Sequence, residues 1–121
     1  MAQILVVDDS STVRNEVGDF LQKNGFTVAF AVDGKDGLVK LKADPAVKLV
    51  VCDVNMPNMD GITMVKEIKK LPNYKFMPVI MLTTEGDENK KLEGKAAGAK
   101  AWIVKPFRPE QLVKAVSMLL M

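Results

Sequence analysis

Residues 4–9 read ILVVDD, and residues 49–53 read LVVCD. Each stretch is typical of a buried strand that ends at carboxylates. If the two strands are parallel neighbours, Asp8, Asp9 and Asp53 converge at the carboxyl edge of the sheet, where open α/β folds bind their ligands. Like charges at such short range resist joint ionisation unless a cation lies among them. Mg²⁺ prefers oxygen ligands of this kind, so the pattern predicts phosphate chemistry at an acidic magnesium site.

The rest of the chain alternates between strand and helix patterns. Turn and cap residues separate the segments: Asn24 follows the first helical pattern, Asp33 and Asp60 precede the next two, and Gly98 follows the fourth. The predicted strands are 3–7, 27–31, 48–52, 78–82 and 101–104, and the predicted helices lie around 13–21, 37–41, 62–71, 88–97 and 112–120.

Five apolar strands separated by helices predict an α/β fold, a doubly wound parallel sheet covered on both faces. A length of 121 residues with 48% hydrophobic content fits a single domain, residues 1–121, without an effector domain. Apolar runs are far shorter than the roughly 20 residues of a membrane span, and no signal-peptide pattern is present. Cys52 is the only cysteine, as is common in reducing compartments. We therefore expect a cytoplasmic protein without membrane insertion.

Charge and composition narrow the function. The net charge of +2 is too small to indicate DNA binding. The chain has no histidine, so it lacks the commonest general base and any phosphohistidine of its own. A phosphoryl group bound at the acidic site must therefore come from another molecule.

Four features at strand ends resemble the receiver domain of bacterial response regulators, in particular its free-standing chemotaxis members. They are the pair Asp8-Asp9, the segment DVNMPNMDG at 53–61, Thr83 after the fourth strand, and Lys105-Pro106-Phe107 after the fifth. The resemblance covers the whole chain. It implies a flavodoxin-like five-stranded (βα)5 sandwich with strand order 2-1-3-4-5.

The resemblance implies roles for the acidic residues and their neighbour. Asp53 is the nucleophile that becomes an aspartyl phosphate. Asp9 and Asp53 bind Mg²⁺ directly, Asp8 binds it directly or through water, and Asn55 contributes its backbone carbonyl. The alternative is that Asp53 caps a loop or helix, and that the Asp8-Asp9 pair with Ser10 caps the first helix.

The resemblance also implies a phosphoryl-binding and switch group. Lys105 offsets charge on the phosphoryl group and is aimed into the pocket by a cis bond to Pro106. Thr83 binds the new phosphate, and Thr84 stands beside it where a small residue is common. Trp102 occupies the aromatic switch position, where most relatives have tyrosine or phenylalanine. The alternative roles are a loop cap for the two threonines and space filling for Trp102.

Two further positions set the lifetime of the signal in this family. Asn55 lies two residues after Asp53, and Glu85 lies two residues after Thr83. These positions tune the access of water to the phosphoryl group. A small polar residue at position 55 and an acid at position 85 resemble those of chemotaxis receivers whose phosphoryl group is rapidly hydrolysed.

The implied function is a phosphorylation-dependent switch of a two-component system that acts as a monomer. Such a protein is not an enzyme, although it assists its own phosphorylation and dephosphorylation. The donor is a histidine kinase, in chemotaxis the receptor-coupled one, and a phosphatase is a further partner. Output passes through the fourth helix, fifth strand and fifth helix to the flagellar motor switch protein or another target.

Other functions use similar residues. A single-domain phosphate shuttle or sink, or a regulator outside motility, has the same site. A haloacid-dehalogenase-type phosphatase needs a second acid where Asn55 stands, and it needs a cap for its substrate. A flavodoxin needs a phosphate loop after the first strand, where Asp8 and Asp9 repel phosphate. An unphosphorylated binding module does not need the intact acidic set.

Overall fold

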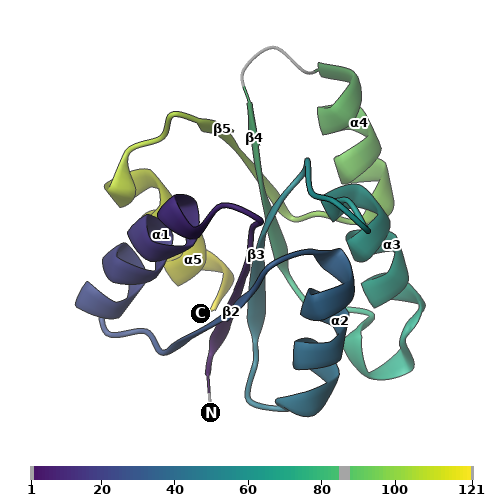
Figure 1. Ribbon diagram of the computed structural model, residues 1–121, viewed down its shortest axis with the longest axis horizontal. Coiled ribbons are helices and arrows are strands. Elements are labelled where there is room, and N and C mark those ends of the chain that lie inside the picture. Colours follow the sequence, from purple (N-terminus) through teal and green to yellow (C-terminus); the bar gives the residue numbers. More distant parts are fainter. Residues whose placement is uncertain (1, 85–87, 121) are drawn as a thin grey trace.

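The computed structural model describes residues 2–84 and 88–120 (Figure 1). In these ranges strands and helices alternate, and a short 3-10 helix, Pro72–Tyr74, precedes the fourth strand. The elements are β1 (Ile4–Val7), α1 (Ser11–Lys23), β2 (Val28–Ala31), α2 (Gly34–Ala43), β3 (Leu49–Asp53), α3 (Gly61–Lys70), β4 (Val79–Thr84), α4 (Glu88–Ala97), β5 (Ala101–Lys105) and α5 (Pro109–Leu119).

The strands form one parallel sheet in the order β2-β1-β3-β4-β5. Val7 in β1 lies opposite Cys52 in β3, and Asp53 lies opposite Leu82 in β4. The predicted doubly wound topology and strand order are confirmed. This register brings the end of β1 next to the end of β3.

Two helical layers cover the sheet. Helices α1 and α5 lie on one face, and α2, α3 and α4 lie on the other (Figure 1). Because strand side chains alternate between the faces, Ile4 and Val6 join the core under α1 and α5, whereas Leu5 and Val7 join the core on the other face. Strands buried on both faces explain the continuous apolar runs of the sequence.

Polar side chains and glycines mark the helix ends. The side chains of Ser10, Asp33 and Asp60 accept hydrogen bonds from backbone N–H groups three residues later, at 3.3, 2.8 and 2.8 Å. Gly25 and Gly98 follow α1 and α4 with φ of 90° and 116°. These boundaries agree with the sequence prediction. None of the described helices combines the length and the apolar character needed to cross a membrane.

Three predicted strand ends were wrong by one or two residues. β3 includes Asp53, β4 extends to Thr84, and β5 includes Lys105, because Thr84 still pairs with Lys105 across the two strands. α2 is also longer than predicted, because the Asp33 cap begins the helix at Gly34. Asp53, Thr83 and Lys105 therefore lie on the last rungs of the sheet, where pairing restrains their backbones, whereas Asp8 and Asp9 follow β1 directly.

Candidate functional site

Three carboxylates meet at the carboxyl edge of the central strands. Asp8 and Asp9 follow β1, and Asp53 ends the neighbouring strand β3. One oxygen atom from each of the three lies within 4.8 Å of those from the others. Asp8 and Asp53 are buried, whereas Asp9 is exposed. The structure thus brings these three acids together in a cluster with one open side.

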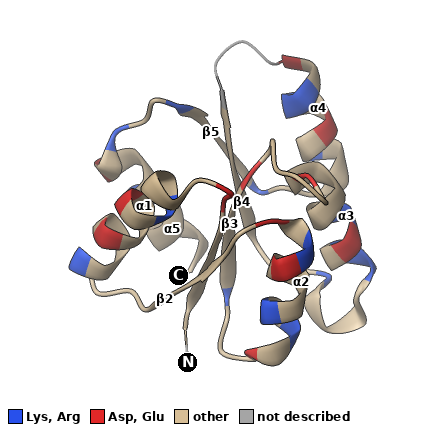
Figure 2. Cartoon of the chain, viewed as in Figure 1, with Lys and Arg blue, Asp and Glu red and all other residues tan. Residues whose placement is uncertain are grey.

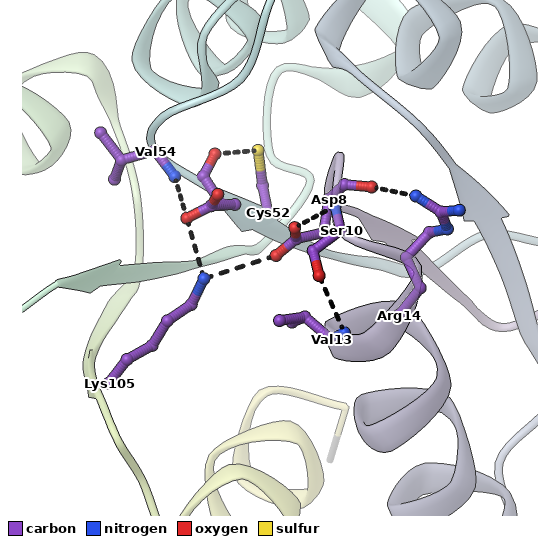
Figure 3. A network of polar contacts seen from close by, with 8 residues as sticks. Asp8, Ser10, Val13, Arg14, Cys52, Val54 and Lys105 are labelled. Carbon is purple, nitrogen blue, oxygen red and sulfur yellow. Dashed lines mark hydrogen bonds and ion pairs between the residues drawn. The ribbon is translucent and has the colours of Figure 1, made fainter.

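The ammonium group of Lys105 enters this acidic cluster (Figure 3). Its Nζ lies 3.2 Å from Oδ1 of Asp53 and 3.5 Å from Oδ2 of Asp8. Lys105 is the last residue of β5, and its peptide bond to Pro106 is cis. The side chain is 23% exposed, and its ammonium group contacts both buried acids.

Asp53 has an unfavourable electrostatic environment for a carboxylate. Its Oδ1 accepts hydrogen bonds from the backbone N–H of Val54 at 2.9 Å and from Lys105. Burial is the main factor that raises the pKa of Asp53, and the negative charge of Asp8 raises it further. The charge and hydrogen bond of Lys105 oppose this rise without cancelling it. Further positive charge near Asp53 would therefore stabilise its ionised form.

Asp8 is oriented by the start of α1. Its Oδ1 accepts a hydrogen bond from the N–H of Ser10 at 2.9 Å, and its backbone carbonyl accepts one from Nη1 of Arg14 at 2.7 Å (Figure 3). The hydroxyl of Ser10, rather than an acid of the pair, caps α1 through Val13. Sequence reasoning missed Arg14, because nothing in its spacing distinguishes it from an exposed helical arginine.

Asn55 lies in the loop between β3 and α3, beside the acidic cluster. With Asp9, Asp60 and Lys90 it lines a shallow hollow of about 370 Å³. Asn55 is exposed. Glu85, the other predicted lifetime residue, lies outside the described residues.

A contact that sequence reasoning missed anchors this loop. Asn58 has a φ of 65°, and its Nδ2 donates to Oδ2 of Asp33 at 2.7 Å. The N–H of Gly34 donates to the carbonyl of Met59 at 3.2 Å. Hydrogen bonds from the N–H of Asp36 and from Asn58 lower the pKa of buried Asp33. The cap of α2 therefore also holds the loop that carries Asn55.

Two predicted switch residues, Thr83 and Trp102, lie on the other face of the sheet. Thr83 is buried and, by strand alternation, shares a face with Met81, which packs in the core under α2 and α3. Asp53 and Lys105 follow Val51 and Ile103 by two residues, and those two residues pack in the core under α1 and α5. Trp102 also packs against the core of the Thr83 face, and its ring contacts α4. Thr83 and Trp102 are therefore not part of the acidic cluster.

The strand positions beside these residues link the two groups. The backbone of Thr84 pairs with that of Lys105, and Thr83 pairs with Val104. Backbone pairing therefore holds the end of β4, which carries Thr83, next to the end of β5, which carries Lys105.

The donor set fits a hard cation such as Mg²⁺. Carboxylate oxygens from Asp8, Asp9 and Asp53 are its preferred protein ligands. The adjacent Cys52 is unsuited to metal binding: its thiol donates to the backbone carbonyl of Asp53 at 3.2 Å, and burial raises its pKa. A protonated thiol is a poor ligand, so the cluster offers oxygen atoms only.

The chain is similar to known proteins in sequence and in fold. The family model of the response regulator receiver domain matches residues 4–117. Chemotaxis protein CheY1 of Helicobacter pylori is 37% identical over 119 residues, which is 98% of this chain and 96% of the relative. Chemotaxis protein CheY of Bacillus subtilis is 39% identical, with 95% and 94% covered. The structure of CheY4 from Vibrio cholerae has a TM-score of 0.90 and 44% identity, with 98% of each chain covered.

The family match covers nearly the full length of the chain, and the fold is the one expected for that family. The matched residues include all three carboxylates and Lys105, and the strand order equals that expected for the family. Receiver domains are signalling switches rather than classical enzymes. The chain belongs to the response regulator receiver domains of two-component signalling, and within them it is similar to CheY.

Proposed function

We propose that the chain is a stand-alone, phosphorylation-dependent chemotaxis switch that accepts a phosphoryl group on Asp53 with Mg²⁺ as cofactor. The observation that carries the proposal is the contact of Lys105 with Asp53 at 3.2 Å, inside a cluster completed by Asp8 and Asp9. A nucleophilic carboxylate, a cation for the phosphoryl oxygens and a metal-binding acid pair are the parts that this transfer needs.

The transfer uses a phosphohistidine of a sensor kinase as donor. A carboxylate oxygen of Asp53 attacks the phosphorus atom, the P–N bond breaks, and its electron pair returns to the imidazole. Val54 and Lys105 hold the carboxylate, and Lys105 offsets charge on the phosphoryl oxygens. Mg²⁺ held by the three aspartates and the backbone carbonyl of Asn55 would supply further positive charge to those oxygens. Attack of water on the phosphorus breaks the P–O bond to Asp53, releases inorganic phosphate and returns the Asp53 carboxylate.

The signal then reaches the opposite face of the sheet. Thr83 binds the phosphoryl group through its hydroxyl. This requires the end of β4 to shift, because Thr83 lies on the sheet face opposite Asp53. The paired β5 and Trp102 follow this shift, as does α4, in a two-state transition. The output face consists of α4, β5 and α5. Leu92 and Val104, which are 65% and 38% exposed, give this face apolar contacts.

The partners follow from the similarity to chemotaxis proteins. The donor is the receptor-coupled histidine kinase, and the target on the α4-β5-α5 face is the flagellar motor switch protein. A phosphatase shortens the signal. The similarity to chemotaxis proteins over almost their whole length supports a function in chemotaxis.

The first test is the intact mass of the chain after brief incubation with acetyl phosphate. We expect one phosphoryl adduct in the presence of Mg²⁺, a strongly reduced yield with a chelator, and none in Asp53→Asn. The variant with Asp36→Asn removes a carboxylate of α2 and should label normally. Absence of an adduct, under conditions that label another receiver domain, would overturn the assignment of Asp53.

A second test addresses the output. Binding of the motor switch protein is measured with phosphorylated and unphosphorylated chain. Tighter binding after phosphorylation supports the motor assignment. Equal or absent binding, with normal labelling of Asp53, would instead favour a phosphate shuttle or a regulator outside motility.

A further inference from the structure

A shallow groove runs between α3 and α4, which lie side by side on one face of the sheet (Figure 1). We name it the α3–α4 groove. It encloses about 420 Å³. The residues that line it are Lys66, Lys69, Lys70, Glu93, Ala96 and Ala97.

The α3–α4 groove lies at the opposite edge of the sheet from the acidic cluster. Lys100, which follows α4, donates its N–H to the carbonyl of Val79, the first residue of β4, at 2.9 Å. The acidic cluster lies instead at the carboxyl ends of β1 and β3. The end of α3 and the end of α4 both lie near the amino edge, because these helices run antiparallel to the strands they connect. A ligand in the groove therefore does not contact the phosphorylation site.

The lining of the groove combines basic side chains with small apolar ones. Three lysines face one glutamate, so the lining residues carry a net charge of +2. All three lysines of the lining lie on α3, and α4 contributes the glutamate and the two alanines. Figure 2 marks the basic positions of both helices in blue. Ala96 and Ala97 contribute small apolar surface between the two helices. This combination suits carboxylates that flank small apolar side chains.

Lys69 is the most constrained cation of the groove. A methyl group on Gly98 would lie 3.1 Å from its Cε, so the aliphatic stem runs close along the end of α4. Its Nζ donates to the carbonyl of Met77 at 2.6 Å. Burial and the nearby charge of Lys100 lower the pKa of Lys69. Within residues 2–84 and 88–120, no carboxylate forms an ion pair with this ammonium group.

The other groove lysines have little internal neutralisation. Lys70 pairs with Glu67 at 3.4 Å, but both side chains are well exposed, so this pair contributes little. In the described part of the chain, Lys66 forms no ion pair. An external carboxylate would therefore find several cations that the fold itself leaves uncompensated.

We propose that the α3–α4 groove is a docking site for an acidic segment of a partner protein, with small apolar residues between its carboxylates. The carboxylates pair with Lys66, Lys69 and Lys70, and the apolar residues pack on Ala96 and Ala97. Glu93 in the lining disfavours a nucleic acid, because its carboxylate would repel the regularly spaced phosphates of the backbone. Because the groove does not contact Asp53, the unphosphorylated chain already presents this site to the partner.

The test uses the full chain and a fluorescein-labelled synthetic peptide that alternates Glu-Glu pairs with Ala-Leu pairs. Binding is measured by fluorescence anisotropy at about 50 mM salt, where surface electrostatics are only partly screened. We expect saturable binding, and amide chemical-shift changes confined to the ends of α3 and α4. Equal binding of the same peptide with Gln for Glu would overturn the proposal, as would shift changes centred on another surface.

Charge reversal provides the matched comparison. The double variant with Lys66→Glu and Lys70→Glu should bind the acidic peptide about tenfold more weakly than the unchanged chain does. A control with Lys42→Glu and Lys48→Glu makes the same charge change at two exposed lysines outside the groove, and it should stay within about twofold of the unchanged chain. Equal weakening in both variants would mean general electrostatic attraction and would overturn the proposal. If the reversal disturbs folding, Lys66→Gln with Lys70→Gln repeats the test.

Two further measurements test the class of partner and the independence of the groove from Asp53. A single-stranded DNA oligonucleotide that binds at the groove as tightly as the peptide would overturn the choice of a protein partner. Asp53→Asn should bind the peptide as the unchanged chain does. Failure of phosphorylation therefore leaves this proposal intact, and loss of peptide binding leaves the function of Asp53 intact.

Discussion

The indole ring of Trp102 in β5 lies directly on the backbone of Gly94 in α4, where any Cβ would overlap its Cζ3 atom. Gly94 is the buried residue of α4, whereas Leu92 on the same helix is 65% exposed. The contact between an aromatic ring and a bare backbone therefore sets how closely α4 approaches the sheet. A change in the position of β5 must alter this contact, which links Trp102 to the output face.

Gly94→Ala should displace the ring of Trp102. We expect the emission of this single tryptophan to shift to longer wavelength. The free energy of unfolding should fall by about 1 kcal/mol, because overpacking outweighs the higher helix propensity of alanine. Fluorescence and urea unfolding measure both effects. Lys95→Ala, at an exposed position on the same helix, should leave the emission unchanged. An unshifted emission spectrum in Gly94→Ala would show that the added methyl group fits without displacing the Trp102 ring, and would contradict the prediction.

Asp53→Asn should stabilise the metal-free protein at neutral pH. Burial and Asp8 raise the folded-state pKa of Asp53, so its favourable contribution to folding exists at low pH and is lost as pH rises through that pKa. At pH 7 we expect the free energy of unfolding of the variant to be higher by at most about 1 kcal/mol, and the gain should shrink below about pH 4. Urea unfolding at both pH values checks this. As a control, Asp9→Asn at an exposed position should change the free energy of unfolding little. A gain in the free energy of unfolding of Asp53→Asn that does not depend on pH would contradict the electrostatic cause.

Lys105→Met should slow phosphorylation of Asp53 and prevent the conformational response of Trp102 to it. The variant keeps an aliphatic stem but loses the cation 3.2 Å from Asp53. We expect slower adduct formation with acetyl phosphate, by about tenfold to a hundredfold, because one charge that stabilises the phosphoryl oxygens is missing. The fluorescence response of Trp102 to phosphorylation should be lost at equal labelling. Lys114→Met on α5 should behave like the unchanged chain. A normal Trp102 response at full labelling would refute a coupling role for Lys105.

Asp33→Ala should weaken both α2 and the loop after β3. It removes the cap at Asp36 and the acceptor for Asn58, and we expect the free energy of unfolding to fall by about 1 to 3 kcal/mol. Adduct formation on Asp53 should also slow, because the loop with Asn55 loses its anchor. Asp33→Asn keeps an oxygen that can cap the helix, so it should recover most of the stability. If Asp33→Ala is destabilised yet labels at the normal rate, the anchor is structural only.

The sequence allowed the site to be predicted where its residues follow long apolar runs. Asp8, Asp9 and Asp53 could be placed together, because parallel strands end at the same edge. The contact between Asp33 and Asn58 could not be predicted in this way. Those residues are 25 positions apart in two separate loops, and only the left-handed backbone of Asn58 brings its amide to the Asp33 carboxylate.

The sequence by itself determined the order of strands and helices, the helix caps and the set of chemical groups at the strand ends. Local propensity and hydrophobic alternation depend on neighbouring residues, and these are visible in the chain. Only the tertiary structure decided that Thr83 and Trp102 lie on the face opposite Asp53, because facing depends on the register and length of β4 and β5. It also decided that α3 and α4 enclose a basic groove, since that requires two helices to pack side by side.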